Sequence, residues 1–168
     1  MYYQELIVTT HTAKNNTMEQ TKYNIFYTDD DTDDQEVFKE IVAELDEEVY
    51  IFTQNNGDEL MRLLENPPPD PRIIFLDLNM PVKNGYEVLK DIRQFEKVST
   101  LPVIIFSTSN DEEAIGLTRR LGANMYITKP ESYDSMRNLL RHILQIDWST
   151  HKVTDADYVY NAKQFSNG

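Results

Sequence analysis

The feature that most constrains the fold is a short apolar run, residues 73–76, which leads directly into Asp77 and lies between Pro71 and Pro81. A continuous apolar run of this length suits a strand covered on both faces, because a half-exposed strand would alternate apolar with polar residues. Asp77 then stands at the carboxyl end of a buried strand. In open α/β sheets this end is where ligands bind. The run therefore predicts a buried parallel strand with a candidate functional residue at its end.

Three further apolar runs are also followed by polar side chains. These are Asp29 and Asp30 after residues 25–27, Ser107 after residues 103–106, and Lys129 after residues 125–127. If the strands are parallel neighbours, these side chains meet around Asp77. Crowded carboxylates repel one another and raise one another's pKa, so such a cluster is tolerable chiefly when a cation lies in it. A divalent metal ion and Lys129 are the candidates for that cation.

The segments between the runs carry apolar residues at helical spacing. After the acidic residues, Val37, Ile41 and Leu45 recur every four positions, and Thr32 with Gln35 matches a capping box that predicts a helix start at Thr32. Further helices are expected around residues 58–65, 88–95, 111–121 and 132–144, and a further strand at 49–53. Five strands alternating with five helices indicate an α/β protein with one doubly wound parallel sheet.

Four acids near the first helix have two different interpretations. Asp33 and Asp34 fall in the first helical turn, where carboxylates complement the helix dipole, and we interpret them as helix-start residues. Asp29 and Asp30 precede the cap, and we interpret them as site residues.

Composition excludes several classes of function. The formal net charge is −13, from 29 acidic residues against 16 lysines and arginines, so binding to nucleic acid is not expected. The absence of cysteine excludes a disulfide scaffold, a thiolate metal site and a cysteine nucleophile. No apolar run approaches the length of a membrane span and the first residues lack the pattern of a secretion signal. The cytoplasm is therefore the expected location, without a membrane partner.

The length suits one domain with two flanking segments. With 168 residues and 40% hydrophobic content, the chain can build one core rather than two. We expect a flexible N-terminal arm over residues 1–22, a domain over 23–146 and a C-terminal tail over 147–168. Met18 is a candidate natural start. The tail is too short for an effector domain. It could pack back on the domain or stay disordered, and of these two disorder is the expectation.

The ordered set Asp29-Asp30, Asp77, Ser107 and Lys129-Pro130 resembles the receiver domain of two-component response regulators, over about residues 23–146. The resemblance implies a single-domain receiver with the flavodoxin-like fold, a five-stranded sheet of order 2-1-3-4-5, and Mg²⁺ as cofactor. It implies these roles: phosphoacceptor, Asp77; metal ligands, Asp30, Asp77 and the backbone carbonyl of Asn79, with Asp29 acting through water; phosphoryl-binding residues, Ser107 and Lys129; switch residues, Ser107 and Tyr126.

The resemblance also implies partners and an output route. The phosphoryl donor would be a sensor histidine kinase or a histidine phosphotransferase, and the output a phosphorylation-dependent contact with a downstream protein or with a second copy, as a homodimer. The expected chemistry is limited to self-catalysed phosphorylation from small donors and autodephosphorylation, without enzymatic turnover. Tyr126 is expected to rotate inward on phosphorylation and change the exposed face between helices 111–121 and 132–144. The Lys129–Pro130 bond is expected to be cis.

Alternative functions use related folds. A phosphorylation-independent pseudo-receiver would normally lack an acid, the hydroxyl or the lysine, and none is missing here. A haloacid-dehalogenase-type phosphatase uses an aspartate nucleophile in a D-x-D pattern, whereas Asp77-Leu78-Asn79 has no second acid to serve as general acid or base. A flavin-binding protein is disfavoured because the acidic first loop would repel the flavin phosphate.

Overall fold

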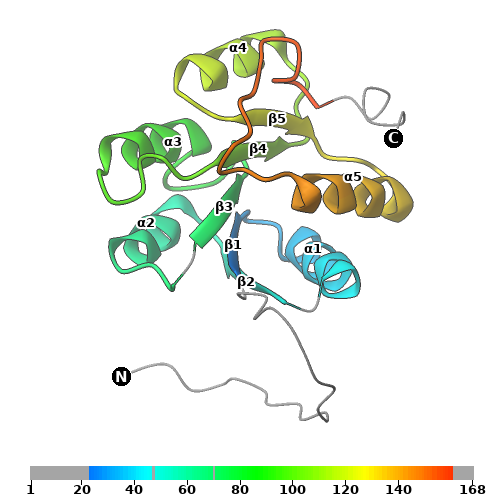
Figure 1. The fold of residues 1–168 in the computed structure, drawn as a ribbon. Helices are drawn as coiled ribbons and strands as arrows, with labels where there is room; N and C mark the ends of the chain where they lie inside the picture. Colours follow the sequence, from blue (N-terminus) through cyan, green and yellow to red (C-terminus); the bar gives the residue numbers. More distant parts are fainter. Residues whose placement is uncertain (1–22, 47, 70, 161–168) are drawn as a thin grey trace.

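The computed structural model describes residues 23–160 apart from 47 and 70, so the expected N-terminal arm lies outside the described residues. Strands and helices alternate along the chain (Figure 1). The strands are β1 (Tyr23–Thr28), β2 (Val49–Gln54), β3 (Pro71–Leu76), β4 (Val103–Ser107) and β5 (Met125–Thr128). The helices are α1 (Thr32–Leu45), α2 (Gly57–Glu65), α3 (Gly85–Gln94), α4 (Glu112–Arg120) and α5 (Tyr133–Gln145).

The strands form one parallel sheet in the order β2-β1-β3-β4-β5. This confirms the predicted flavodoxin-like α/β fold. All five residues of β4 are buried, as are the last four of β3. Their continuous apolar runs therefore have the predicted cause, because each face of these central strands is covered by helices.

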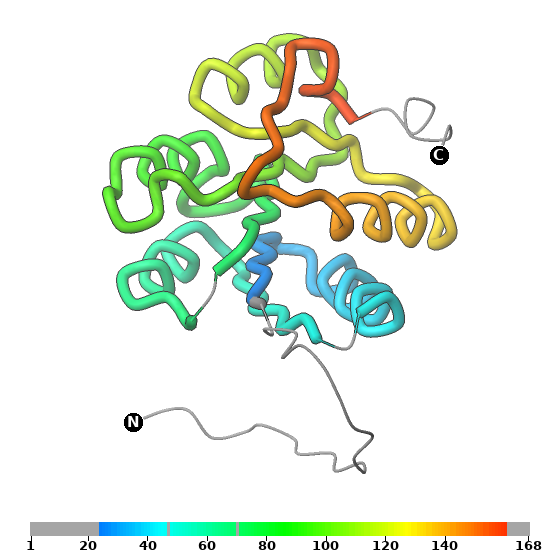
Figure 2. Tube along the Cα trace, in the orientation of Figure 1, coloured from blue at the N-terminus to red at the C-terminus, as the bar shows by residue number. Residues whose placement is uncertain are grey.

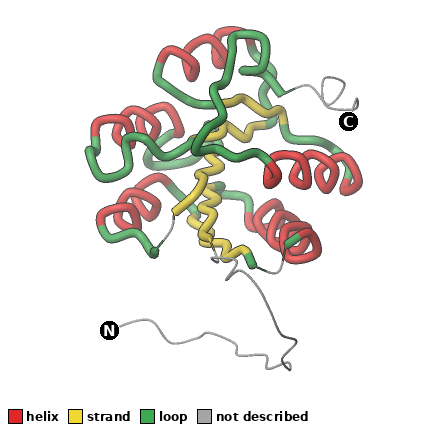
Figure 3. The backbone as a smooth tube through the Cα atoms, viewed as in Figure 1, coloured by secondary structure: helices red, strands yellow, loops and turns green. Residues whose placement is uncertain are grey.

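Helices cover the two faces of the sheet unequally. The helices α1 and α5 pack on one face, and α2, α3 and α4 on the other (Figures 1 and 3). On the α1 face, four buried aromatic rings from three strands and one helix lie together, with Phe38 of α1 4.4 Å from the Tyr27 centroid and 4.9 Å from that of Phe75. Truncating a buried ring of this kind typically costs about 3–5 kcal/mol of unfolding free energy. Tyr27 and Phe75 are therefore fixed near the ends of the strands that lead to the acids.

The helix α1 begins at Thr32 as predicted, but its N-cap residue differs from the prediction by one position. Asp31, not Thr32, is the N-cap residue, and its carboxylate accepts hydrogen bonds from the amides two and three residues further on. Gln35 completes no capping box, because its buried side chain donates instead to the carbonyls just after β1 and at the end of β2. A charged acceptor interacts more favourably than a hydroxyl with the positive end of the helix dipole.

Two backbone features near the loops also bear on the predictions. Gly122 follows α4 with φ of 93°, as expected for the left-handed residue after a helix end. No cis peptide bond occurs among the described residues, so the expected cis Lys129–Pro130 bond is wrong for this structure. A proline bond differs little in energy between its isomers, so the sequence alone did not determine the outcome.

No helix in the described part of the chain is long and apolar enough to cross a membrane.

The C-terminal strap, residues 147–160, is ordered along the domain. It leaves the end of α5, passes in front of the sheet beside α4 and runs along the outer edge of β5 (Figures 1 and 2). Trp148 and Tyr158 are buried in it, and Val159 forms a parallel bridge with Tyr126. The expected disorder is therefore wrong for residues 147–160, because two aromatic side chains and the open strand edge supply packing. The rest of the expected tail, residues 161–168, lies outside the described residues.

Candidate functional site

Backbone hydrogen bonds beyond the strands bring the acids to one edge of the sheet. The Asp29 amide donates to the Gln54 carbonyl at 3.0 Å, and the Asp77 amide donates to the Thr28 carbonyl at 2.9 Å. These bonds continue the parallel pairing of β1 with β2 and with β3. The two aspartates therefore begin the loops at the carboxyl ends of neighbouring strands, where parallel sheets place their sites.

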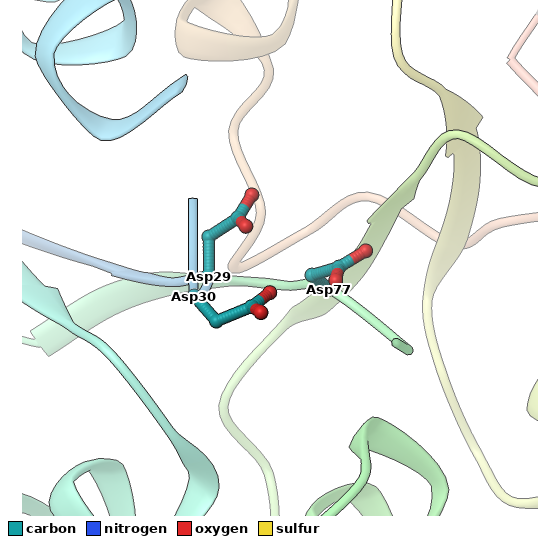
Figure 4. Close-up of side chains that lie close together, drawn as sticks. All are labelled: Asp29, Asp30 and Asp77. Carbon is teal, nitrogen blue, oxygen red and sulfur yellow. The ribbon is translucent and has the colours of Figure 1, made fainter. Parts of the chain in front are cut away.

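Asp29, Asp30 and Asp77 form a carboxylate cluster (Figure 4). One ligand atom from each residue lies within 4.8 Å of the others. Asp29 is 1% and Asp77 5% exposed, whereas Asp30 is exposed. Divalent cations such as Mg²⁺ take oxygen ligands and keep several waters. A site of two or three carboxylates that is open to solvent on one side therefore suits such a cation. The donor set fits a hard divalent ion.

The negative charge of the Asp77 carboxylate is poorly compensated by its surroundings. Burial is the largest cause that raises its pKa to about 6, and the nearby charge of Asp29 adds to the rise. The charge of Lys129 and the backbone amides of Leu78 and Asn79 act in the opposite direction. The Asn79 amide lies 3.1 Å from Asp77 Oδ2. A positive charge near Asp77 would therefore be favourable.

Lys129 lies over the same edge but is bonded to other acids. Its Nζ is 2.5 Å from Asp29 Oδ2 and 2.8 Å from Asp34 Oδ2, and its side chain is 8% exposed. Burial alone would lower the pKa of Lys129, but the hydrogen bonds to the two aspartates outweigh burial and raise it. Asp34 is thus a partner of the lysine as well as a helix-start residue. The prediction had assigned Asp34 only the second role, since their contact spans 95 residues of sequence.

The Asp29 carboxylate has a further buried partner that the sequence did not indicate. The Tyr27 hydroxyl donates to Asp29 Oδ2 at 2.5 Å, and the Asp31 amide donates to Oδ1 at 3.0 Å. Burial, followed by the negative charge of Asp29, raises the pKa of Tyr27 far above its usual value. The hydroxyl therefore stays protonated and fixes the orientation of the carboxylate. A tyrosine in an apolar strand is normally a core residue, so nothing in the sequence indicated that the Tyr27 hydroxyl would contact Asp29.

Ser107 and Tyr126 lie beside each other at the ends of β4 and β5. Ser107 is fully buried, its backbone carbonyl accepts from the Lys129 amide at 2.8 Å, and its Oγ accepts from the Ser109 amide at 3.3 Å. Tyr126 is also fully buried, and its hydroxyl donates to the Ser109 carbonyl at 2.9 Å. Burial is the main cause that raises the pKa of Tyr126. The Tyr126 ring therefore lies inward in this structure, and its expected rotation on phosphorylation stays a prediction.

Gly85 determines how closely the next helix approaches the cluster. A Cβ atom at this position would lie 2.3 Å from the Asp77 carbonyl oxygen and 2.8 Å from the Leu78 Cα. The Gly85 amide also donates to the Leu78 carbonyl at 3.1 Å. Since the conflict is with backbone atoms, a larger residue would move the loop that follows Asp77.

Residues 25–155 match the family model of the response regulator receiver domain. With the parallel sheet and the carboxylate cluster, this match shows that the chain belongs to the response regulator receiver family. Receiver domains are phosphoryl-accepting modules of two-component signalling, not enzymes with turnover.

Among characterised relatives, the chain is 32% identical over 114 residues to the response regulator Rcp1 of Synechocystis sp., covering 65% of this chain and 75% of Rcp1. It is 33% identical over 128 residues to the probable C4-dicarboxylate response regulator DctR of Bacillus subtilis, covering 76% of this chain but only 55% of DctR. Among solved structures, the phosphorylated cyanobacterial phytochrome response regulator RcpA has a TM-score of 0.70 at 29% identity, covering 78% of this chain and 97% of RcpA. The Mn²⁺-bound form of Rcp1 has a TM-score of 0.66 at 25% identity, covering 79% and 99%.

Proposed function

We propose that the chain is a response regulator that accepts a phosphoryl group on Asp77, with Mg²⁺, and passes the signal on through phosphorylation-dependent protein contacts. The observation that carries the proposal is the buried Asp77 carboxylate within 4.8 Å of the ligand atoms of Asp29 and Asp30. The phosphorylated RcpA and Mn²⁺-bound Rcp1 structures support it by similarity.

The chain's own residues suit phosphoryl transfer to a carboxylate. An Asp77 oxygen forms the bond to phosphorus while the bond from phosphorus to the donor's histidine nitrogen, or to the acetate oxygen of acetyl phosphate, breaks and the leaving group departs with the electron pair. Because the pKa of Asp77 is about 6, the carboxylate is mostly ionised above neutral pH and can attack. The reaction needs charge neutralisation and in-line placement more than covalent help.

Two side chains supply that neutralisation on the protein side. Lys129 exchanges its contact with Asp34 for a phosphoryl oxygen while it stays near Asp29, and the Ser107 hydroxyl donates to another phosphoryl oxygen. The half-exposed position of Asp34 makes it the partner that is lost more easily. Lys129 therefore compensates the acids before transfer and the phosphoryl group after it.

Mg²⁺ would be held by Asp30, Asp77 and the Asn79 backbone carbonyl, with Asp29 acting through water. When bound, it neutralises negative charge on the phosphoryl oxygens and on the acids. Asp29 suits the water-mediated role because its two oxygens already accept bonds from Tyr27, Lys129 and the Asp31 amide.

The partners follow from the chemistry of the acyl phosphate. A sensor histidine kinase or a histidine phosphotransferase donates the group, and a downstream protein or a second copy of the chain reads the modified state. The net charge of −13 supports protein partners over nucleic acid. We place the chain in the cytoplasm, where such donors work.

The test is phosphorylation by acetyl phosphate, followed by intact-mass measurement. The wild type should gain one phosphoryl group when Mg²⁺ is present and none when it is chelated. Asp77→Asn should gain none, whereas Asp33→Asn, an exposed acid in the first turn of α1, should behave as wild type. Modification of Asp77→Asn at the wild-type rate would refute the assignment. A wild type that stays unmodified would favour the phosphorylation-independent pseudo-receiver.

A further inference from the structure

The C-terminal strap bonds to both backbone groups of Tyr126. The Tyr126 amide donates to the Tyr158 carbonyl at 2.7 Å, and the Tyr160 amide donates to the Tyr126 carbonyl at 2.8 Å. The two strap residues that make these bonds, Tyr158 and Tyr160, lie beyond the match to the receiver family, which ends at residue 155. At Tyr126 the strap thus pairs with the outer edge of β5 as an added strand would, and this pairing is limited to one residue of β5.

The Tyr158 side chain is buried in the space between α4 and β5. It is 3% exposed and belongs to the same apolar cluster as Tyr126. Its hydroxyl donates to Thr118 Oγ1 of α4 at 2.9 Å, and Arg119 lies 5.5 Å from its ring centroid. Arg119 also forms an ion pair with Asp155 of the strap. Ring, hydroxyl and ion pair together attach the strap to α4.

The contacts continue from Tyr126 toward the acids. The Tyr126 hydroxyl is bonded to the Ser109 carbonyl in the loop after β4, and the Ser109 amide is bonded to Ser107 Oγ. The carbonyl of Ser107 in turn accepts from the Lys129 amide. A continuous series of packed or bonded groups therefore joins Tyr158 to the hydroxyl and the lysine that serve Asp77 in the proposed function.

We propose that the strap is an intramolecular ligand of the space between α4 and β5, and that Tyr158 is a positioning residue for phosphoryl transfer to Asp77. With Tyr158 packed in the same apolar cluster, the Tyr126 ring stays inward, where its hydroxyl holds the loop that follows Ser107. The proposal rests on the proposed function of Asp77.

The coupling has a defined sign. Phosphorylation draws Ser107 toward the phosphoryl oxygens and favours the inward Tyr126, and the docked strap favours the same position. Because coupling between two binding events is reciprocal, a docked strap favours the phosphorylated state and phosphorylation favours the docked strap.

The first experiment compares Tyr158→Ala with Tyr158→Phe, in the full chain, for the rate of phosphorylation by acetyl phosphate at saturating Mg²⁺. Tyr158→Phe keeps the ring, and its phosphorylation rate should stay within about two-fold of the wild-type rate. Tyr158→Ala should react about five-fold more slowly than wild type, which corresponds to the lower end of usual coupling energies. Mg²⁺ affinity without a phosphodonor should be the same in all three proteins, which separates coupling from general damage. Equal phosphorylation rates for Tyr158→Ala and wild type would overturn the proposal.

A second variant covers the case in which Tyr158→Ala does not fold. Tyr160→Pro removes the N–H that donates to the Tyr126 carbonyl, together with the Tyr160 ring that lies beside His142. It leaves Tyr158 itself unchanged, and it should slow phosphorylation in the same direction. In the wild type, beryllofluoride with Mg²⁺ should slow hydrogen exchange at the Tyr126 and Tyr160 amides. Unchanged exchange there, in a protein that binds beryllofluoride, would contradict the coupling. A wild type that accepts no phosphoryl group would overturn both proposals. A wild type that is phosphorylated, with variants that react at the same rate as wild type, would overturn only this one.

Discussion

The carboxylate cluster and the space between α4 and β5 both contain a buried tyrosine, but the two hydroxyls do different work. Tyr27 donates to the charged Asp29, beside an Asp77 whose charge is poorly compensated. Tyr158 donates to Thr118, whose own hydroxyl donates to the Ala114 carbonyl, so both of these hydroxyls are bonded to neutral acceptors. The first region holds charge at a cost in stability that a bound cation or phosphoryl chemistry can reduce. The second contributes stability through apolar packing.

Of the substitutions that test this difference between the two regions, removal of Lys129 should have the largest effect on stability. Lys129→Met leaves Asp29 buried without its ion-pair partner, so the free energy of unfolding at neutral pH should fall by about 3–5 kcal/mol. Urea denaturation without metal measures the loss. The control is Asp34→Asn, which removes the half-exposed partner of the same lysine and should cost less than about 1 kcal/mol. Equal losses in the two variants would mean that the cluster does not hold a costly buried charge.

Removing the Asp77 charge should stabilise the metal-free protein. Folding raises the pKa of Asp77 from 3.8 to about 6, so the penalty for ionising it in the folded state is absent below about pH 4, grows between about pH 4 and 6, and is nearly constant above that range. Asp77→Asn should therefore unfold at a higher urea concentration than wild type at pH 7.5, with a free energy of unfolding that is greater by on the order of 2–3 kcal/mol. This gain should disappear near pH 4. Asp33→Asn serves as the exposed control. A gain that does not depend on pH would show that packing, not charge, separates wild type from variant.

The two tyrosines allow a smaller and more direct comparison. Tyr27→Phe removes a donor from a buried carboxylate and should cost about 1.5–3 kcal/mol, whereas Tyr158→Phe removes a neutral hydrogen bond and should cost about 1 kcal/mol. Thermal or urea unfolding at one pH measures both. Added Mg²⁺ should change the first difference more than the second, because only Tyr27 contacts the acidic cluster. Identical costs with identical responses to Mg²⁺ would remove the distinction between the regions.

The sequence predicted the fold and the place of Asp77 because both follow from short-range patterns. Apolar runs that end in Asp77, Ser107 and Lys129, separated by amphipathic helices, imply parallel strands whose ends meet at one edge. The proposed roles of these residues remain predictions. The pairing of Lys129 with Asp34 was missed because it joins residues 95 positions apart, and a helix-start role already explained the acid.

Docking of the strap was the less favoured of two alternatives for a different physical reason. Residues 147–160 contain no helical or alternating apolar period, and their order depends on single anchors such as Trp148 and Tyr158. An isolated aromatic residue in a polar segment has the same local pattern whether it docks or not. The open edge of β5 and the space beside α4 decide the matter. The predicted strand order implied the edge, but the local pattern of residues 147–160 does not show that they dock there.

The strap also limits how sheets of two molecules could join. A strand edge with free amides and carbonyls can pair with an edge of another molecule, and a sheet with two open edges can add molecules without limit. Here the strap bonds to both backbone groups of Tyr126 on the outer edge of β5, which leaves β2 as the other edge strand within the described part of the chain. Pairing between two β2 edges uses the same surface on both molecules and closes after two copies. A protein with this arrangement can form a two-fold pair through its sheet but is protected from growing into a fibre by the same route.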